Sequence, residues 1–209
     1  GKGTQAKLLA EEYGLVHLSS GEALRASAKT RTPLGRFLTR QLQTGRLTPI
    51  STLIKVFEQN IKKIPRSQGL VLDGFARQIT ETRILLGKLK KLKRPINAAV
   101  FIDIPNAASI RRLSKRLQCD RCNRIYIKSG QLQAGARCPK CDGRLYQRND
   151  DKPAAIRKRL VYYRKHTLPV IKFFRSRGLL IVINGSQSVA RVHKDIARAL
   201  VRKGLLLKK

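Results

Sequence analysis

Residues 98–104 read Ala-Ala-Val-Phe-Ile-Asp-Ile, an apolar run that indicates a buried β-strand and decides the fold class. Similar short runs occur at Leu15–Leu18, Gly69–Asp73 and Leu180–Ile183, and the segments between them have the spacing of helices. Uniformly apolar strands that alternate with helices are typical of a parallel sheet covered on both faces. The sequence therefore predicts an α/β fold with a parallel β-sheet and helices on both of its faces.

The segments between the apolar runs carry the signals that begin and end helices. Gly14 follows the first expected helix, and Ser19 or Ser20 can cap the second one. Pro169 is expected to end or kink a long helical stretch locally. The expected helices span Lys2–Tyr13, Pro33–Thr44, Thr48–Lys63, Ile79–Leu92, Asn106 or Ser109 to about Leu117, Lys152–Arg177, and Ser188–Lys203.

Length and charge limit the possible classes of protein. The 209 residues suggest one domain with room for a small insertion. No apolar run is long enough for a membrane-spanning helix, so no membrane association is expected. The net charge of +34 favours encounters with polyanions, and a nucleotide site would use only a small part of it. Two interpretations stay open for the remainder: a generally basic composition, or nonspecific contact with RNA.

The cysteines form a pattern typical of a metal site. Cys119 and Cys122 make one CxxC pair, Cys138 and Cys141 make another, and fifteen residues separate the pairs. Such pairs bring thiolates into a tetrahedron around Zn²⁺, and a site closed by four protein ligands is structural. The alternative is four free thiols. Clustered cysteines of this kind favour a reducing, cytoplasmic setting.

The start of the chain resembles the end of a phosphate-binding loop. Gly1-Lys2-Gly3-Thr4 lies directly before an expected helix, whose first N–H groups and dipole favour an anion. Compared with G-x-x-x-x-G-K-[ST], Gly3 occupies the Ser/Thr position and Thr4 follows it. Lys2 would bridge the outer phosphates, and Thr4 would approach the metal-bound ones. The tetrapeptide alone is a weak signal, and the alternative is a plain helix start.

Further motifs follow in a fixed order. They are Gly-Lys-Gly-Thr-Gln (1–5), Ser-Gly-Glu-Ala-Leu-Arg (20–25), Leu-Asp-Gly-Phe-Ala-Arg (72–77), Arg-Asn-Asp-Asp (148–151) and Ile-Arg-Lys-Arg-Leu (156–160). Over nearly the whole chain this series resembles the adenylate kinase family of nucleoside monophosphate kinases, in the long form with a zinc-binding lid. In that family a first strand and a Gly-x-Pro-Gly-x segment precede Gly1. Both are absent, so we expect an N-terminally truncated chain whose first strand is missing.

The resemblance implies a division of the chain and an activity. The core would comprise 1–117 and 148–209, with a helical part at about 19–63 that binds the monophosphate. Residues 118–147 would be a zinc-ribbon lid insertion that excludes water when it closes. The implied activity is reversible Mg²⁺-dependent phosphoryl transfer, ATP + AMP ⇌ 2 ADP, by a cytoplasmic monomer that maintains nucleotide homeostasis. The alternatives are a GMP or pyrimidine acceptor, or a weakly active basic protein that binds RNA.

The resemblance also assigns site residues, among which arginines dominate because guanidinium groups bind phosphate oxygens bidentately. The implied catalytic residues are Lys2, Asp73, Arg77, Arg116, Arg148 and Arg159. Those implied for ATP are Gly1, Lys2, Gly3, Thr4, Arg112 and Arg116. Those implied for AMP are Ser20, Arg25, Gly74, Arg77, Glu81, Arg148 and Arg159. Asp73 would hold the water shell of Mg²⁺, and Asp150 and Asp151 would bind the lid arginines on closure.

The chain departs from the family pattern at three positions. Ala76 replaces the usual proline before Arg77, and Glu22 replaces a common aspartate. Glu81 stands where the family usually has a glutamine that reads adenine. A carboxylate only accepts hydrogen bonds, so Glu81 would suit the N1–H and 2-amino donors of guanine. A one-position slip or a solvent-facing Glu81 is the alternative, and AMP stays the favoured acceptor.

Overall fold

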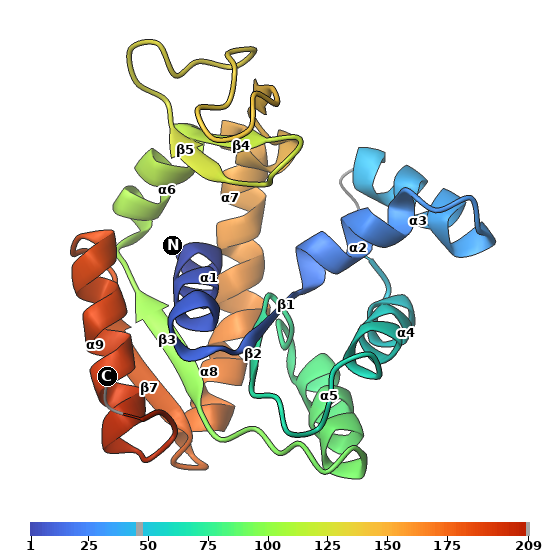
Figure 1. Ribbon diagram of the computed structural model, residues 1–209, viewed down its shortest axis with the longest axis vertical. Helices are drawn as coiled ribbons and strands as arrows, with labels where there is room; N and C mark the ends of the chain where they lie inside the picture. Colours follow the sequence, from blue (N-terminus) through green and yellow to red (C-terminus); the bar gives the residue numbers. More distant parts are fainter. Residues whose placement is uncertain (45–47, 208–209) are drawn as a thin grey trace. The chain divides into compact units, whose positions relative to one another are not determined.

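The computed structural model describes residues 1–44 and 48–207 (Figure 1). The chain forms two compact units, Gly1–Asp103 with Lys165–Lys209 and Ile104–Arg164, which are described separately. The expected monophosphate-binding part at 19–63 belongs to the first unit, although its residues 45–47, including the expected helix stop Gly45, lie outside the described residues. The cysteine-containing insertion belongs to the second unit.

The strands of the first unit form parallel pairs. Strand β1 (Val16–Ser19) pairs with β2 (Leu70–Asp73), and β3 (Ala99–Asp103) pairs with β7 (Leu180–Asn184). Every pair is parallel, as the apolar runs predicted. Within the described residues the hydrogen bonds form two separate ladders. The register aligns Ser19 with Asp73, so the carboxyl ends of β1 and β2 lie at the same edge.

Helices connect and cover these strands. Helix α1 ends at Gly14, whose φ of 63° is left-handed, and the Ser19 hydroxyl accepts from the N–H of Glu22 to cap α2. Both predicted end signals are therefore confirmed. The helices of this unit are α1 (Lys2–Tyr13), α2 (Ser20–Ala28), α3 (Pro33–Thr44), α4 (Ile50–Ile61), α5 (Ile79–Lys91), α8 (Leu168–Arg175) and α9 (Val189–Arg202).

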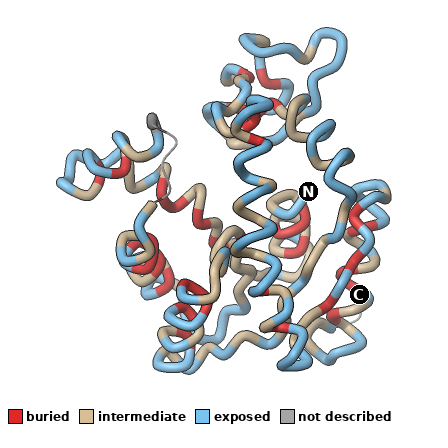
Figure 2. Tube along the Cα trace, turned by 180° about the vertical axis from the view of Figure 1, so that it is seen from behind, coloured by how far each residue is buried: buried red, intermediate tan, exposed pale blue. Residues whose placement is uncertain are grey.

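The core of the first unit consists of aliphatic clusters between strands and helices. One cluster joins α1, β7 and α9 through side chains such as Leu9, Ile183 and Ile196. Another joins β1, α4 and α5, with Phe57 and Leu89 almost fully buried. Figure 2 shows the buried positions of α4 and α5 in red. Packing of this kind stabilises the strand ends that carry the candidate site residues.

The long helical stretch expected at Lys152–Arg177 is interrupted. It consists of α7 (Pro153–Tyr162), a π-helical turn (Tyr163–Thr167) and α8. Pro169 lies in the first turn of α8, directly after the π-helical turn, and it has no N–H to donate to a preceding carbonyl oxygen. The expected local break at Pro169 is therefore confirmed.

The second unit carries a small antiparallel sheet with the strand order β5-β4-β6. Its elements are α6 (Asn106–Ser114), β4 (Arg116–Cys119), β5 (Ile125–Ile127), β6 (Leu145–Tyr146), a 3₁₀ turn η1 (Asn149–Asp151) and α7. The helix expected to continue to about Leu117 ends at Ser114, so that prediction is wrong. Leu117 packs with Cys119 and Leu145 inside this sheet, and pairing with distant strands overrides the local helical pattern.

A helix can cross a membrane only if it is long and apolar enough. Across the residues that the structure describes, no helix combines the length and the apolar character that crossing a membrane requires.

Candidate nucleotide and metal sites

The first turn of α1 and the end of β2 meet at one place in the first unit. Gly1 is the N-cap of α1, and Gly3 and Thr4 follow Lys2 in its first turn. The Lys2 ammonium forms an ion pair with Asp73, the last residue of β2. A Cβ at Gly3 would lie 3.1 Å from Asp73 Oδ2, so a larger residue there would crowd the carboxylate. The structure thus brings the predicted phosphate-binding residues beside the predicted Mg²⁺ residue.

The electrostatic state of Asp73 follows from its surroundings. Burial would raise its pKa, because the side chain is only 8% exposed. The neighbouring His17 and the Lys2 cation outweigh burial and hold the pKa of Asp73 well below its usual range. Asp73 is therefore a carboxylate at neutral pH, and two thirds of the Lys2 side chain remains open to solvent. An ionised oxygen ligand of this kind suits Mg²⁺ or its water shell.

The turn after β2 brings Ser20, Gly74 and Arg77 together. Gly74 has a φ of 82°, and a Cβ on it would lie 2.5 Å from Ser20 Oγ and 3.3 Å from Arg77 Nη2. Only glycine fits both the left-handed backbone and this close approach. Arg77 Nε donates to the Gly74 carbonyl oxygen at 2.9 Å. Arg25, in the last turn of α2, folds back toward Gly21 of the same helix.

Glu81 is buried and not solvent-facing, which excludes one of the alternatives left open by the sequence. Only 3% of the surface of Glu81 is exposed. The N–H of Ala76 donates to Oε1 at 2.8 Å, and the N–H of Arg77 donates to Oε2 at 3.1 Å. Burial raises the pKa of Glu81, and these two N–H groups oppose that rise. The carboxylate is thus directed at the backbone of the turn that carries Arg77.

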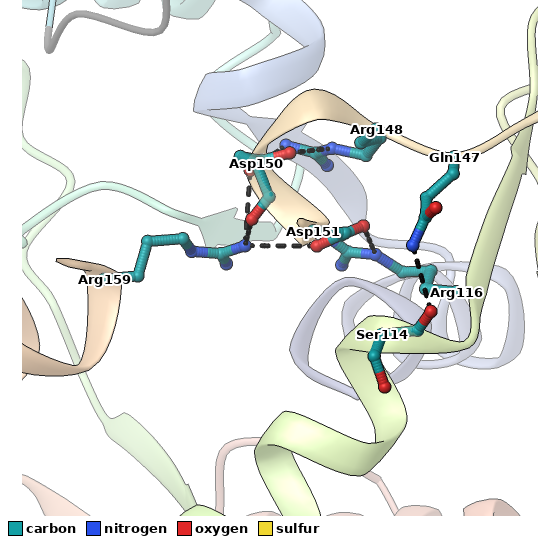
Figure 3. A network of polar contacts seen from close by, with 7 residues as sticks. All are labelled: Ser114, Arg116, Gln147, Arg148, Asp150, Asp151 and Arg159. Atoms are coloured by element: carbon teal, nitrogen blue, oxygen red, sulfur yellow. Dashed lines mark hydrogen bonds and ion pairs between the residues drawn. The ribbon is translucent and has the colours of Figure 1, made fainter. Parts of the chain in front are cut away.

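Three of the predicted arginines lie around two adjacent carboxylates in the second unit (Figure 3). Arg116 binds Asp151 through Nε and Nη2, both at 2.7 Å. Arg148 binds Asp150 in the same two-pronged way, at 2.8 and 2.7 Å. Arg159 Nη1 lies 3.3 Å from an oxygen of each aspartate. The side chains come from β4, from the segment after β6, from η1 and from α7. Arg148 lies two residues from Asp150, whereas Arg116 is 35 residues away from Asp151 and reaches it only through the tertiary structure.

The charges of this cluster are unequal. Three guanidinium groups face two carboxylates, so a positive charge remains. Burial would raise the pKa of Asp150, but the charge and hydrogen bonds of Arg148 outweigh it and hold that pKa below its usual value. Asp151 is fully buried, whereas 44% of the Arg159 side chain is exposed. A preorganised group of arginines with excess positive charge can bind a phosphoryl group.

Two further predictions concern residues of this unit. Arg112 lies on an exposed part of α6. The role predicted for Asp150 and Asp151 concerns the closed lid and stays a prediction. In this structure both aspartates orient Arg116, Arg148 and Arg159.

The four cysteines come together as their spacing predicted. Their Sγ atoms all lie within 4.8 Å of one another, with Cys119 and Cys141 at 3.5 Å and Cys122 and Cys138 at 3.7 Å. Four thiolates about 2.3 Å from a tetrahedral Zn²⁺ would lie roughly 3.8 Å apart. The donor set and these spacings therefore fit a structural zinc ion.

Sequence reasoning missed two neighbours of these sites. The Tyr126 hydroxyl lies 3.2 Å from Cys138 Sγ and can donate to a thiolate. His17, on β1, is nearly buried with Nε2 3.6 Å from Asp73 Oδ2. Both residues lie in apolar strand segments, where a tyrosine or histidine is usually part of the core. Only the alternation of side chains along a strand could have indicated that they face a functional group.

Comparison with known proteins supports the same assignment. The family model described as "Adenylate kinase" matches residues 1–179. The chain belongs to the adenylate kinase family. It is 33% identical over 204 residues to an adenylate kinase of Thermodesulfovibrio yellowstonii, covering 97% of this chain and 95% of that protein. Adenylate kinases of Syntrophotalea carbinolica and Methanothrix thermoacetophila are each 36% identical over 201 residues, covering 96% of this chain and 93% of the relative.

Membership of this family makes the chain a nucleoside monophosphate kinase, a phosphotransferase. The family also accounts for the arrangement found here, with parallel strands, helices and a cysteine cluster in one chain. Its substrates are nucleotides, so the clusters around Asp73, Arg77 and Asp151 are the candidate nucleotide sites.

Proposed function

We propose that this protein is an adenylate kinase that catalyses ATP + AMP ⇌ 2 ADP and maintains the balance of adenine nucleotides. The observation that carries the proposal is the arginine cluster held by Asp150 and Asp151. Transfer of a phosphoryl group needs positioned positive charge more than covalent chemistry. A phosphate oxygen of AMP attacks the terminal phosphorus of ATP, the bond to the bridging oxygen breaks, and both products are ADP.

The residues divide the work between donor and acceptor. Gly1, Gly3 and Thr4 present the first turn of α1 to the phosphates of ATP, and Lys2 supplies a flexible cation. Arg112 and Arg116 also bind ATP in this proposal. The acceptor monophosphate is bound by Ser20, Gly74 and the two arginines Arg25 and Arg77. The grouping of Ser20, Gly74 and Arg77 on the acceptor side is supported by the close approach of Ser20 and Arg77 to Gly74.

Arg116, Arg148 and Arg159 surround the transferred phosphoryl group in this proposal. Their guanidinium groups are already oriented by carboxylates, so less order is lost when phosphate binds. Asp150 and Asp151 act as positioning residues. Because guanidinium groups remain charged at neutral pH, the cluster offers positive charge throughout the physiological range.

Asp73 would hold Mg²⁺ through its water shell, with the first turn of α1 beside it. When bound with ATP, Mg²⁺ supplies positive charge that neutralises the phosphate oxygens. The chemistry of the donor fits, since Asp73 is an ionised carboxylate and the side chain of Lys2, its ion-pair partner, is largely exposed.

The cysteine cluster would hold Zn²⁺ as the structural centre of residues 118–147, which we propose to be the lid. The small apolar core around the cysteines contains few side chains besides Leu145 and the neighbouring Leu117, so a metal would supply much of the lid's stability. Reduced thiolates of this kind, together with the nucleotide substrates, favour the cytoplasm as the setting. We propose a monomer, since each role named above is filled by a residue of one chain.

The proposal is tested by following ADP formation from Mg-ATP with AMP, GMP, CMP and UMP offered separately. Fast turnover with AMP is expected, whereas a preference for GMP or a pyrimidine nucleotide would assign a different acceptor. Arg148→Lys should reduce the rate by roughly 10²–10³, as removal of one preorganised donor does. Arg137→Lys is the matched control, because Arg137 is 67% exposed and pairs only with the exposed Asp142 among the ion pairs described. Absence of turnover with every acceptor would refute the proposal.

A second property, nonspecific contact with RNA, is favoured by one surface of the first unit. Arg94 donates to the carbonyl oxygens of Ile64, Pro65 and Gln68 and thereby ties the end of α5 to the segment after α4. Exposed cations gather on the two segments joined in this way: Lys62, Lys63, Arg66, Lys90, Lys91 and Lys93. We call these six residues the basic corner.

The two segments that carry the basic corner, residues 62–68 and 88–94, are rich in lysine and contain no acidic residue, which suits a phosphate backbone. If all six cations contact single-stranded RNA, the logarithm of affinity should fall with the logarithm of salt concentration with a slope of about −4. A variant with Lys62, Lys63, Lys90 and Lys91 changed to glutamine should flatten that slope. Salt-insensitive binding, or an unchanged slope in the variant, would reject this property without affecting the kinase proposal.

A further inference from the structure

The turn between β2 and α5 combines the two departures from the family pattern that lie closest to Arg77. Ala76 stands in place of proline and Glu81 in place of glutamine. The structure shows that they are partners, since the Ala76 N–H donates to Glu81 Oε1 at 2.8 Å. A proline at position 76 has no N–H and could not make this bond.

The backbone at Ala76 also excludes proline. Its φ is +60°, in the left-handed region that non-glycine residues rarely adopt, whereas a proline ring holds φ near −65°. A strained conformation of this kind persists only where its surroundings hold it. Glu81 does so with both carboxylate oxygens, because Oε2 accepts from the N–H of Arg77 at 3.1 Å.

Glu81 is well placed for this task. It lies in the first turn of α5, where a carboxylate is favoured by the helix dipole, and it reaches back to the residues before the helix. The residue is 3% exposed, so the carboxylate has little contact with solvent. Both Oε1 and Oε2 accept from the backbone of the turn.

The turn ends in Arg77, whose side chain is set by the same backbone. Arg77 Nε donates to the Gly74 carbonyl oxygen, and its Nη2 lies on the same side of Gly74 as Ser20 Oγ. A second anchor comes from Thr167, whose hydroxyl donates to the Arg77 carbonyl oxygen at 3.1 Å. Glu81 therefore fixes the backbone position from which the side chain of Arg77 extends.

We propose that Glu81 is a positioning residue that holds Arg77 toward the phosphate of the acceptor nucleotide, and that its carboxylate does not read the acceptor base. The inference rests on the proposed function, because it assigns Arg77 to the acceptor phosphate. It predicts that Ala76 and Glu81 act as one unit, and that the selectivity between acceptor bases is set by other residues.

The test compares Glu81→Gln, Ala76→Pro and the double variant, with AMP and GMP as acceptors. An amide side chain has one acceptor oxygen and places N–H donors against a backbone N–H, so Glu81→Gln should raise the KM for the monophosphate roughly tenfold. The factor should be the same for AMP and GMP, and the KM for ATP should not change. The double variant should lose much less than the product of the two single effects, because both changes break the same hydrogen bond between the Ala76 N–H and Glu81 Oε1, and that bond can be lost only once.

The matched control is Glu58→Gln, which removes a partly exposed carboxylate paired with Lys88 in the same unit. It should leave each KM unchanged. A change in the ratio of AMP to GMP selectivity in Glu81→Gln would identify Glu81 as a base reader and overturn the proposal. Single effects that multiply in the double variant would overturn it as well.

A readout without turnover separates this inference from the proposed function. The backbone amide hydrogens of Ala76 and Arg77 should be protected from exchange in the unliganded protein and should exchange at least several-fold faster in Glu81→Gln, but not in Glu58→Gln. If the protein phosphorylates no monophosphate, the proposed function fails while this exchange experiment still tests the turn. Unchanged exchange in Glu81→Gln would refute the role of Glu81 even in an active kinase.

Discussion

Substitution of Asp151 by asparagine should destabilise the second unit strongly. Asp151 is fully buried, and Arg116, which binds it through two hydrogen bonds of 2.7 Å, is 20% exposed. Removal of one partner from a buried ion pair costs about 3–5 kcal/mol, since the other charge stays buried without compensation. Asparagine keeps one acceptor oxygen, and part of Arg116 still reaches water. We therefore expect the lower end, about 3 kcal/mol.

Urea denaturation, followed by circular dichroism, measures this loss in the free energy of unfolding. For a chain of this length, about 3 kcal/mol corresponds to a decrease in Tm of roughly 6–12 °C. Asp142→Asn is the control, because Asp142 is 73% exposed and its partner Arg137 is 67% exposed, so solvent screens the pair. If Asp151→Asn were no more destabilising than Asp142→Asn, the argument that Asp151 compensates a buried cation would be refuted.

Three further predictions concern the metal cluster, the core and the strand end. Cys138→Ser removes one of the four thiolates, so it should abolish stoichiometric zinc binding and lower the Tm. Metal analysis measures the zinc content, and retention of zinc would contradict this prediction. Phe57→Ala should lower the free energy of unfolding, measured in denaturant titrations, by about 3–5 kcal/mol. Phe57 is fully buried, and its ring centroid lies 5.3 Å from that of Phe75 in an edge-on arrangement. The control Phe37→Ala, at a position that is 38% exposed, should change this free energy far less. The pKa of Asp73 is lowered in the folded state, so its interactions stabilise the fold above the unfolded pKa of about 3.9 and are lost as the pH falls below it. Asp73→Asn should therefore flatten the dependence of stability on pH below about 4. An unchanged pH profile would contradict the lowered pKa of Asp73.

Local signals in the sequence predicted most helices and strands of the first unit. Helix ends such as Gly14 and Ser19 could be predicted because a left-handed glycine and a capping hydroxyl act within a few residues of themselves. The strand at Ala99–Asp103 was recognisable for a similar reason, since a short apolar run between helices is typical of a strand in a buried sheet.

Predictions from local pattern failed where distant segments compete for the same residues. Residues up to Leu117 have a helical pattern, yet Arg116–Cys119 forms the central strand of a sheet whose partners are Ile125–Ile127 and Leu145–Tyr146. Burial of Leu117 against the cysteine cluster stabilises the strand more than one further turn would stabilise the helix. Helix propensity is a weak preference, so tertiary packing overrides it here.

The sequence by itself determined the family, the order of the motifs and the grouping of the four cysteines, because these depend on residue types and their spacing. Only the tertiary structure decided where the charged side chains are directed. It turned Glu81 inward to the N–H groups of Ala76 and Arg77, and it gathered Arg116 and Arg159 around Asp151. The physical reason is that a buried carboxylate must be paired with donors or cations, and which of them are near depends on how distant segments of the chain pack together.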